Sequence, residues 1–143
     1  MNESAVSRLC KLDRVIKRRF DKLADSTGIN GAEGRVIHYL ILNQDKITFQ
    51  KDVEIEFDLR PSSASELLKR MEKKGLIERM SVESDARLKK IVLTDKSREH
   101  EERITRDLLK FEADTQVGIS DEDLDVFDRV TNIIMANLKN IND

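Results

Sequence analysis

The chain has 143 residues, of which 38% are charged and 4% aromatic, and its formal net charge is −2. This length suits one domain with a hydrophobic core, and one proline with five glycines favours a mainly helical, soluble protein. The single Cys10 excludes an intrachain disulfide, and neither a transmembrane run nor a signal-peptide core is present, so we expect a cytoplasmic protein without membrane contact.

The charges are unevenly distributed along the chain. Residues 1–59 carry ten basic and ten acidic side chains, whereas residues 60–90 carry nine and five, a net charge of +4. Residues 91–143 carry seven basic and thirteen acidic side chains, a net charge of −6. A basic middle segment beside an acidic end indicates one surface that faces a polyanion.

Two helices are expected first. The first runs from about Ser4 to Ala24, with a basic polar face and apolar residues at helical spacing. Its basic face is most simply explained as a solvated surface with carboxylates nearby. The second runs from about Ala32 to Leu42 and is apolar nearly all round, which predicts burial.

The spacing of the next two helices is that of a helix-turn-helix. A helix from Thr48 to Phe57 is followed by the tight turn Asp58-Leu59-Arg60 and then by a helix that ends before Gly75. Pro61 suits the first helical position, although the spacing of Ser63 and Glu66 also fits a capping box slightly later. The second helix carries serines first and cations later. In this motif its N-terminal residues enter the major groove of DNA.

A β-hairpin is expected directly after this helix. Ile77–Val82 and Lys89–Leu93 have the pattern of strands, and Glu83–Leu88 that of a polar turn. A hairpin in this place is a wing, and an arginine at its tip can enter a narrow A·T minor groove. Asp85 is spaced to orient Arg87, and Lys89 and Lys90 would lie near phosphates.

Two long helices are expected to close the chain, one from about Asp95 to Gln116 and one that begins at Ser120 and keeps its apolar spacing to the end. The apolar face of the last helix needs a partner, and the candidates are the first helix and a second subunit. The residues expected in a dimer interface are Leu9, Leu124, Phe127, Ile134, Leu138 and Ile141.

Leu59 to Gly75, Ile77–Arg79, Asp85-x-Arg87 and Val92-Leu93-Thr94 together resemble the multiple-antibiotic-resistance regulator (MarR) family. The resemblance covers nearly the whole chain in order. It implies one winged helix-turn-helix domain over residues 1–143, mainly α with a small hairpin. Residues 47–94 would be the DNA-binding part, and residues 4–46 and 95–143 would mainly serve dimerisation.

The resemblance also implies a homodimer on a pseudo-palindromic operator, usually released by a ligand or an oxidant. The expected DNA-binding residues are Arg60, Ser62, Ser63, Ser65, Lys69, Arg70, Asp85, Arg87, Lys89 and Lys90. Two residues depart from the family. Glu66 replaces a basic or neutral residue, which disfavours phosphate contact and leaves it to cap the helix or accept from cytosine N4. Ser97 replaces the usual glycine.

The sequence defines the site that would sense a regulatory signal less clearly than it defines the DNA-binding residues. The family position points to Arg14, His38 and Tyr39 for a small anionic or aromatic ligand, although His38 is more simply a hydrogen-bonded core histidine. Cys10 offers a redox alternative if a nearby group lowers the pKa of its thiol. Two isolated histidines and one cysteine match a zinc site poorly.

We therefore expect a DNA-binding transcriptional regulator, most simply a repressor, without catalytic residues, metal or cofactor. Two alternatives stay open: a redox-sensing regulator acting through Cys10, and a winged-helix module that binds protein and does not recognise DNA. The low net charge and Glu66 favour the second alternative.

Overall fold

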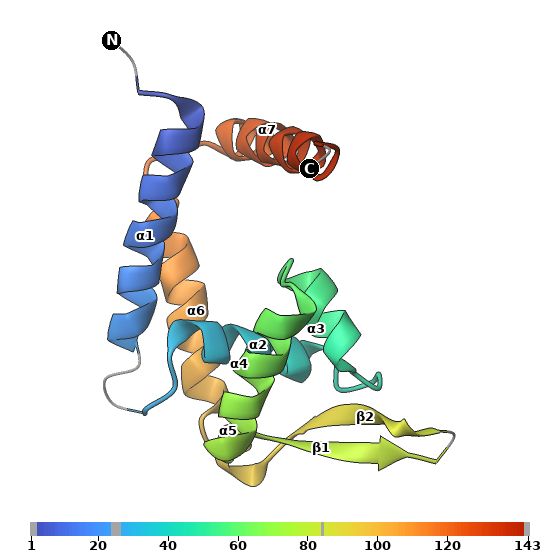
Figure 1. Cartoon of the computed structure of the whole chain (residues 1–143). Coiled ribbons are helices and arrows are strands. Elements are labelled where there is room, and N and C mark those ends of the chain that lie inside the picture. The colour runs from blue at the N-terminus through green and yellow to red at the C-terminus, as the bar shows by residue number, and fades with distance from the viewer. Residues whose placement is uncertain (1–2, 24–26, 84, 142–143) are drawn as a thin grey trace. The chain divides into compact units, whose positions relative to one another are not determined.

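The computed structural model of the chain describes residues 3–23, 27–83 and 85–141. Its elements are α1 (Ala5–Leu23), α2 (Gly31–Leu42), α3 (Gln50–Glu56), α4 (Pro61–Lys73), β1 (Ile77–Val82), β2 (Asp85–Leu93), α5 (Asp95–Glu99), α6 (Glu101–Thr115) and α7 (Asp121–Lys139) (Figure 1). The predicted fold class, mainly α with one β-hairpin, is confirmed. The predicted end of the first helix, at Ala24, lies outside the described residues.

The chain forms two compact units, Met1–Leu109 and Lys110–Asp143, and the boundary falls within α6. The first unit contains the helix-turn-helix and the hairpin. None of the helices in the described ranges is long and apolar enough to cross a membrane.

The helix-turn-helix has the predicted spacing. α3 ends at Glu56, and α4 begins at Pro61 after a turn in which Asp58 has a φ of 49° and the amide of Leu59 donates to the Glu54 carbonyl. α3 is shorter than the predicted Thr48–Phe57 helix, because the Thr48 carbonyl accepts a hydrogen bond from the amide of Ile91 in β2. Thr48 therefore lies against the outer edge of β2.

Pro61 is the first residue of α4, and the capping box predicted for Ser63 and Glu66 is wrong. Arg60 is the N-cap and makes no side-chain capping bond. Because Pro61 fixes φ and has no N–H to satisfy, the helix begins there without a side-chain cap. The predicted apolar face is confirmed, since Ala64, Leu67, Leu68 and Met71 are the buried residues of α4.

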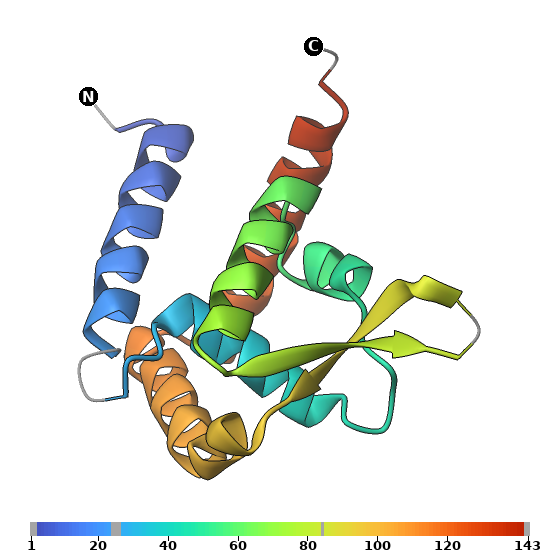
Figure 2. The same cartoon turned by 60° about the horizontal axis from the view of Figure 1, so that its bottom comes forward.

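The hairpin is longer than predicted. β2 begins at Asp85, so the polar turn expected over Glu83–Leu88 is wrong from Asp85 onward. The register shifts between two pairs, because Ser81 is opposite Lys89 whereas Val82 is opposite Asp85. This irregularity accommodates the extra residues of β2, so the polar segment after Asp85 continues that strand. Figures 1 and 2 show the two strands running out from the end of α4.

The helix predicted from Asp95 to Gln116 is interrupted at His100, between α5 and α6. α5 is held at the base of the hairpin, because Ser97 is fully buried and its Oγ donates to the Leu76 carbonyl at 2.5 Å. The Thr94 hydroxyl also donates to the Gly75 carbonyl at 2.6 Å. α6 packs separately on the core through Ile104. The helix therefore breaks between α5 and α6, because each is held by a different contact.

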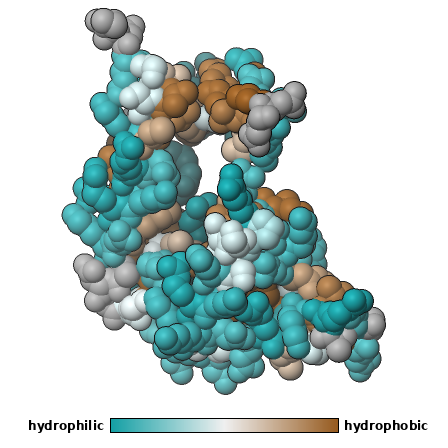
Figure 3. Space-filling view, in the orientation of Figure 1, coloured by the Kyte–Doolittle hydropathy of each residue, from teal (hydrophilic) through white to brown (hydrophobic). Residues whose placement is uncertain are grey.

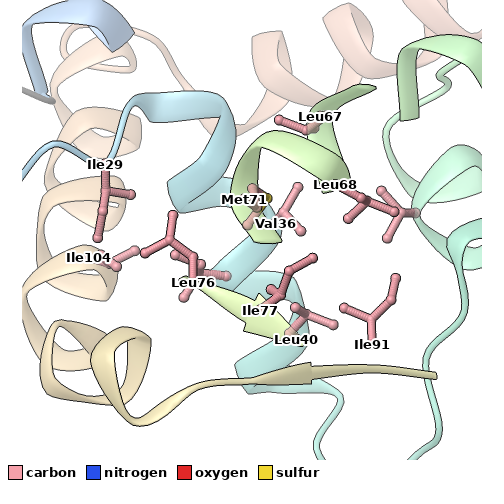
Figure 4. Packing of buried hydrophobic residues seen from close by; sticks show 12 residues of the cluster. Ile29, Val36, Leu40, Leu67, Leu68, Met71, Leu76, Ile77, Ile91 and Ile104 are labelled. Carbon is pink, nitrogen blue, oxygen red and sulfur yellow. The ribbon is translucent and has the colours of Figure 1, made fainter. Parts of the chain in front are cut away.

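One hydrophobic core holds the first unit together. Figure 4 shows side chains of α2, α4, the hairpin and α6 pointing toward one another. α2 is buried on one side only, because Val36 and Ile37 are buried whereas Leu42 is 67% exposed. The core residues are Ile29, Val36, Ile37, Leu40, Val53, Leu67, Leu68, Met71, Leu76, Ile77, Ile91 and Ile104.

The first and last helices have no buried residue. In α7, Phe127 is 54% and Leu138 61% exposed, and Figure 3 shows hydrophobic side chains on the surface of this helix. Leu9, Leu124 and Ile134 are half-buried, and Ile141 is 64% exposed. Part of this apolar face was not predicted, namely Val126, Val130, Ile133 and Met135.

Candidate nucleic-acid interface

The outer face of α4 is polar and accessible. Ser62 and Ser63 lie in the first turn, and Lys69, Arg70 and Lys73 follow on later turns. Within the described part of the chain, no ion pair engages these three cations, so they are available to an external anion. The α4 residues predicted to bind DNA are exposed, except Ser65, which is half-buried. Arg60, which precedes the helix as its N-cap, is also exposed.

The C-terminal end of α4 is fixed by a contact that was not predicted. Lys74 Nζ lies 2.8 Å from Oε1 of Glu33, which is fully buried at the start of α2, and 3.2 Å from the Gly28 carbonyl. The same Oε1 also accepts a hydrogen bond from the Asn30 amide, which completes a capping box at the start of α2. The spacing of Asn30 and Glu33 in the sequence could have revealed this capping role of Glu33. Glu33 Oε2 has no hydrogen-bond partner among the described residues.

The structure brings Asp85 and Arg87 together, as their spacing predicts. Oδ1 of Asp85 accepts from the backbone amide of Arg87 at 2.9 Å and from its Nε at 3.3 Å. These bonds, the backbone one foremost, hold the pKa of the Asp85 carboxyl below its ordinary value. The Arg87 side chain is 92% exposed, so the ion pair orients it without withdrawing it from solvent.

Lys89 and Lys90 project to opposite faces of the hairpin, because successive side chains of a strand alternate. Lys89 is opposite Ser81, whose Oγ accepts from Lys89 Nζ at 2.7 Å. Lys90 is opposite Met80 and half-buried. A wing with one lysine on each face can reach both strands that border a narrow groove.

The candidate ligand residues are not joined by any hydrogen bond or ion pair in the ranges that the structure describes. Arg14 is exposed on α1. His38 is half-buried on α2 without a hydrogen bond from a described residue, so the expected hydrogen-bonded core histidine is wrong. Burial, followed by the charges of Asp52 and Glu56, raises the pKa of Tyr39.

An aromatic cluster beside Tyr39 was not predicted. The Tyr39 ring meets the Phe57 ring edge-on at 5.9 Å between centroids. The Arg35 guanidinium lies 5.1 Å from the Phe57 ring and 5.9 Å from the Phe20 ring, which connects α2 with α3 and α1. Its residues are far apart in the sequence, so periodicity could not reveal it. Over the described residues, His, Cys, Asp and Glu form no metal-binding group.

Helix-turn-helix, hairpin and exposed cations define a winged-helix protein. The model of the MarR family matches residues 27–88. The transcription regulator MarR from Oenococcus oeni PSU-1 is 29% identical, with a TM-score of 0.81 over 92% of this chain and 98% of that one. Over these residues and in its fold, the chain is similar to regulators of the MarR family.

Two further structures share the fold. The S. aureus MepR–DNA complex is 21% identical with a TM-score of 0.83, covering 94% of this chain and 96% of that one. The heme sensor PefR from Streptococcus agalactiae, in complex with heme, is 25% identical with a TM-score of 0.65, covering 95% of each chain. No curated protein sequence is significantly similar to the chain.

Proposed function

We propose that the protein is a transcriptional repressor that binds a pseudo-palindromic promoter operator as a homodimer. The observation that carries the proposal is the exposed face of α4, with serines in its first turn and exposed cations after them, beside a wing that presents Arg87. α4 would enter the major groove and the wing the neighbouring minor groove. The fold shared with MepR, which was solved with DNA, supports this proposal.

A second copy is the partner that the terminal helices favour. α1 and α7 both present apolar side chains to solvent. Residues 5–23 carry seven basic and two acidic side chains, whereas residues 110–143 carry three basic and eight acidic ones. This opposite charge favours pairing of the two segments between copies. Joined copies would place two α4 helices about one DNA turn apart.

A small anionic or aromatic ligand is the proposed signal for release. The Arg35–Phe57–Tyr39 cluster supports this class, because a cation on aromatic rings suits planar or negatively charged molecules. Cys10 is an exposed free thiol, which keeps a redox signal as the second candidate. Thermal-shift screening of the wild type, with Cys10→Ser as the control for oxidant effects, distinguishes the two signals.

The direct test of DNA binding is a footprint on the DNA upstream of the gene, repeated at several salt concentrations. A protected pseudo-palindrome whose affinity falls steeply with salt is expected. Salt-independent or absent protection would instead favour a winged-helix module that binds protein.

The two wing lysines should contribute affinity that does not depend on sequence. Because they project to opposite faces, Lys89→Ala and Lys90→Ala should each remove about one phosphate contact and lower the slope of log K against log salt by about 1. Specific and non-specific DNA should be affected equally. Fluorescence anisotropy over a salt series measures the slope, and an unchanged slope in both variants contradicts this wing placement.

Arg87→Ala should weaken binding most where A·T pairs flank the operator, since a narrow minor groove concentrates negative potential there. The measurement compares A·T and G·C flanks around one fixed operator. Equal losses on both flanks would reduce Arg87 to a phosphate contact.

A further inference from the structure

Glu66 lies at the centre of the exposed face of α4. Successive residues of a helix are rotated by about 100° around its axis. On this count, four side chains of α4 point within roughly 30° of the direction opposite its buried residues. These are Ser62, Glu66, Lys69 and Lys73. Ser63, Ser65 and Arg70 lie nearer the edges of the face. A helix seated in the major groove directs the centre of its outer face to the base edges and its flanks to the phosphates.

The acidic side chain of Glu66 is not engaged in stabilising α4. It does not cap the helix, because α4 begins at Pro61 and no side chain caps it. Within the described part of the chain it forms no ion pair, although Lys69 and Arg70 lie three and four residues further on. An exposed carboxylate that serves neither the helix nor a neighbouring cation is free to contact a ligand.

The chemistry of that contact follows from the charge. A carboxylate is repelled by phosphate and only accepts hydrogen bonds. In the major groove the donors are the amino groups of cytosine and adenine, and the adenine amino group lies beside the N7 acceptor, which repels a carboxylate. Cytosine N4 is therefore the preferred partner.

We propose that Glu66 is a specificity-determining residue that accepts a hydrogen bond from N4 of one cytosine in each half-site. This inference rests on the proposed DNA binding. It gives Glu66 a role opposite to that of the cations beside it, since Lys69 and Lys73 add affinity whereas Glu66 reduces affinity for every sequence except one with cytosine in the right place.

The experiment selects binding sites from randomised duplexes with the wild type, Glu66→Ala and Glu66→Gln. The wild type should prefer cytosine at one position in each half-site by about 5- to 150-fold, the range that one specific base contact supplies. Glu66→Ala should lose this preference and bind non-specific DNA more tightly. Glu66→Gln should prefer adenine there, because a carboxamide both accepts from N6 and donates to N7.

Glu72→Gln is the matched control. Glu72 is also exposed on α4, but it lies at the edge of the outer face and its Oε1 is 3.6 Å from Arg79 Nη2. This variant should select the same sites as the wild type. If both Glu66 variants also select those sites, the inference is wrong while the proposed function stands. If the wild type enriches no sequence, the proposed function itself fails.

Discussion

Leu138→Arg should weaken operator binding by orders of magnitude without changing any residue that would face DNA. Leu138 is 61% exposed on α7, within an apolar face that has no buried residue. Burying the five C-terminal residues among those predicted for the interface, from Leu124 to Ile141, is worth on the order of 8–15 kcal/mol as an upper bound. An arginine there would insert a charge into the proposed interface between copies, and a single winged helix makes too few base contacts for tight binding.

Asn132→Arg is the control for this experiment. It adds the same charge to α7, but Asn132 is exposed on the polar side of the helix. Sedimentation with circular dichroism separates a folded monomer from a partly unfolded protein, and the control should stay dimeric. A folded Leu138→Arg dimer that binds the operator normally would place the interface elsewhere.

Lys74→Met should lower the free energy of unfolding by about 2–4 kcal/mol. It leaves the fully buried carboxylate of Glu33 without its cation, and stranding a buried charge costs several kcal/mol. This expected loss is smaller than the loss on breaking a fully buried ion pair, because the Lys74 side chain is 41% exposed. Urea unfolding at fixed protein concentration measures the loss.

Two variants make this measurement specific. Lys73→Met removes the neighbouring lysine, which has no ion pair with a described residue, and should change the free energy of unfolding by no more than about 0.5 kcal/mol. Adding Glu33→Gln to Lys74→Met removes the stranded charge and should restore part of the loss. If Lys74→Met is as stable as Lys73→Met, the Glu33–Lys74 ion pair does not hold the end of α4.

The elements that local pattern determines could be predicted. α4 shows this best, because Pro61, four apolar residues at helical spacing and Gly75 specify its start, its buried face and its end within 15 residues. The order of helix-turn-helix and hairpin then pointed to the winged helix. The pairing of Asp85 with Arg87 is equally local, since only one residue separates them in the sequence.

The features that escaped prediction depend on residues distant in the sequence. The break at His100 follows from the bond between Ser97 and Leu76, 21 residues apart, and the end of α4 is fixed by Glu33, 41 residues from Lys74. Periodicity within one helix carries no information about such partners. The roles of the proposed DNA contacts are likewise set by how the exposed face meets the groove, which the helical pattern alone does not determine.

The outer edge of β2 also bears on the solubility of the protein. An unpaired strand edge can add a strand from another molecule and begin aggregation. Here the Ile91 amide is bonded to the Thr48 carbonyl and the Arg87 amide to the Asp85 side chain. Lys89 lies between these two positions in the strand, but its Nζ donates to Ser81 on the paired strand β1. The bond between Asp85 and the Arg87 amide thus also limits edge-to-edge association, and replacing Asp85 with an apolar residue would favour aggregates at high protein concentration.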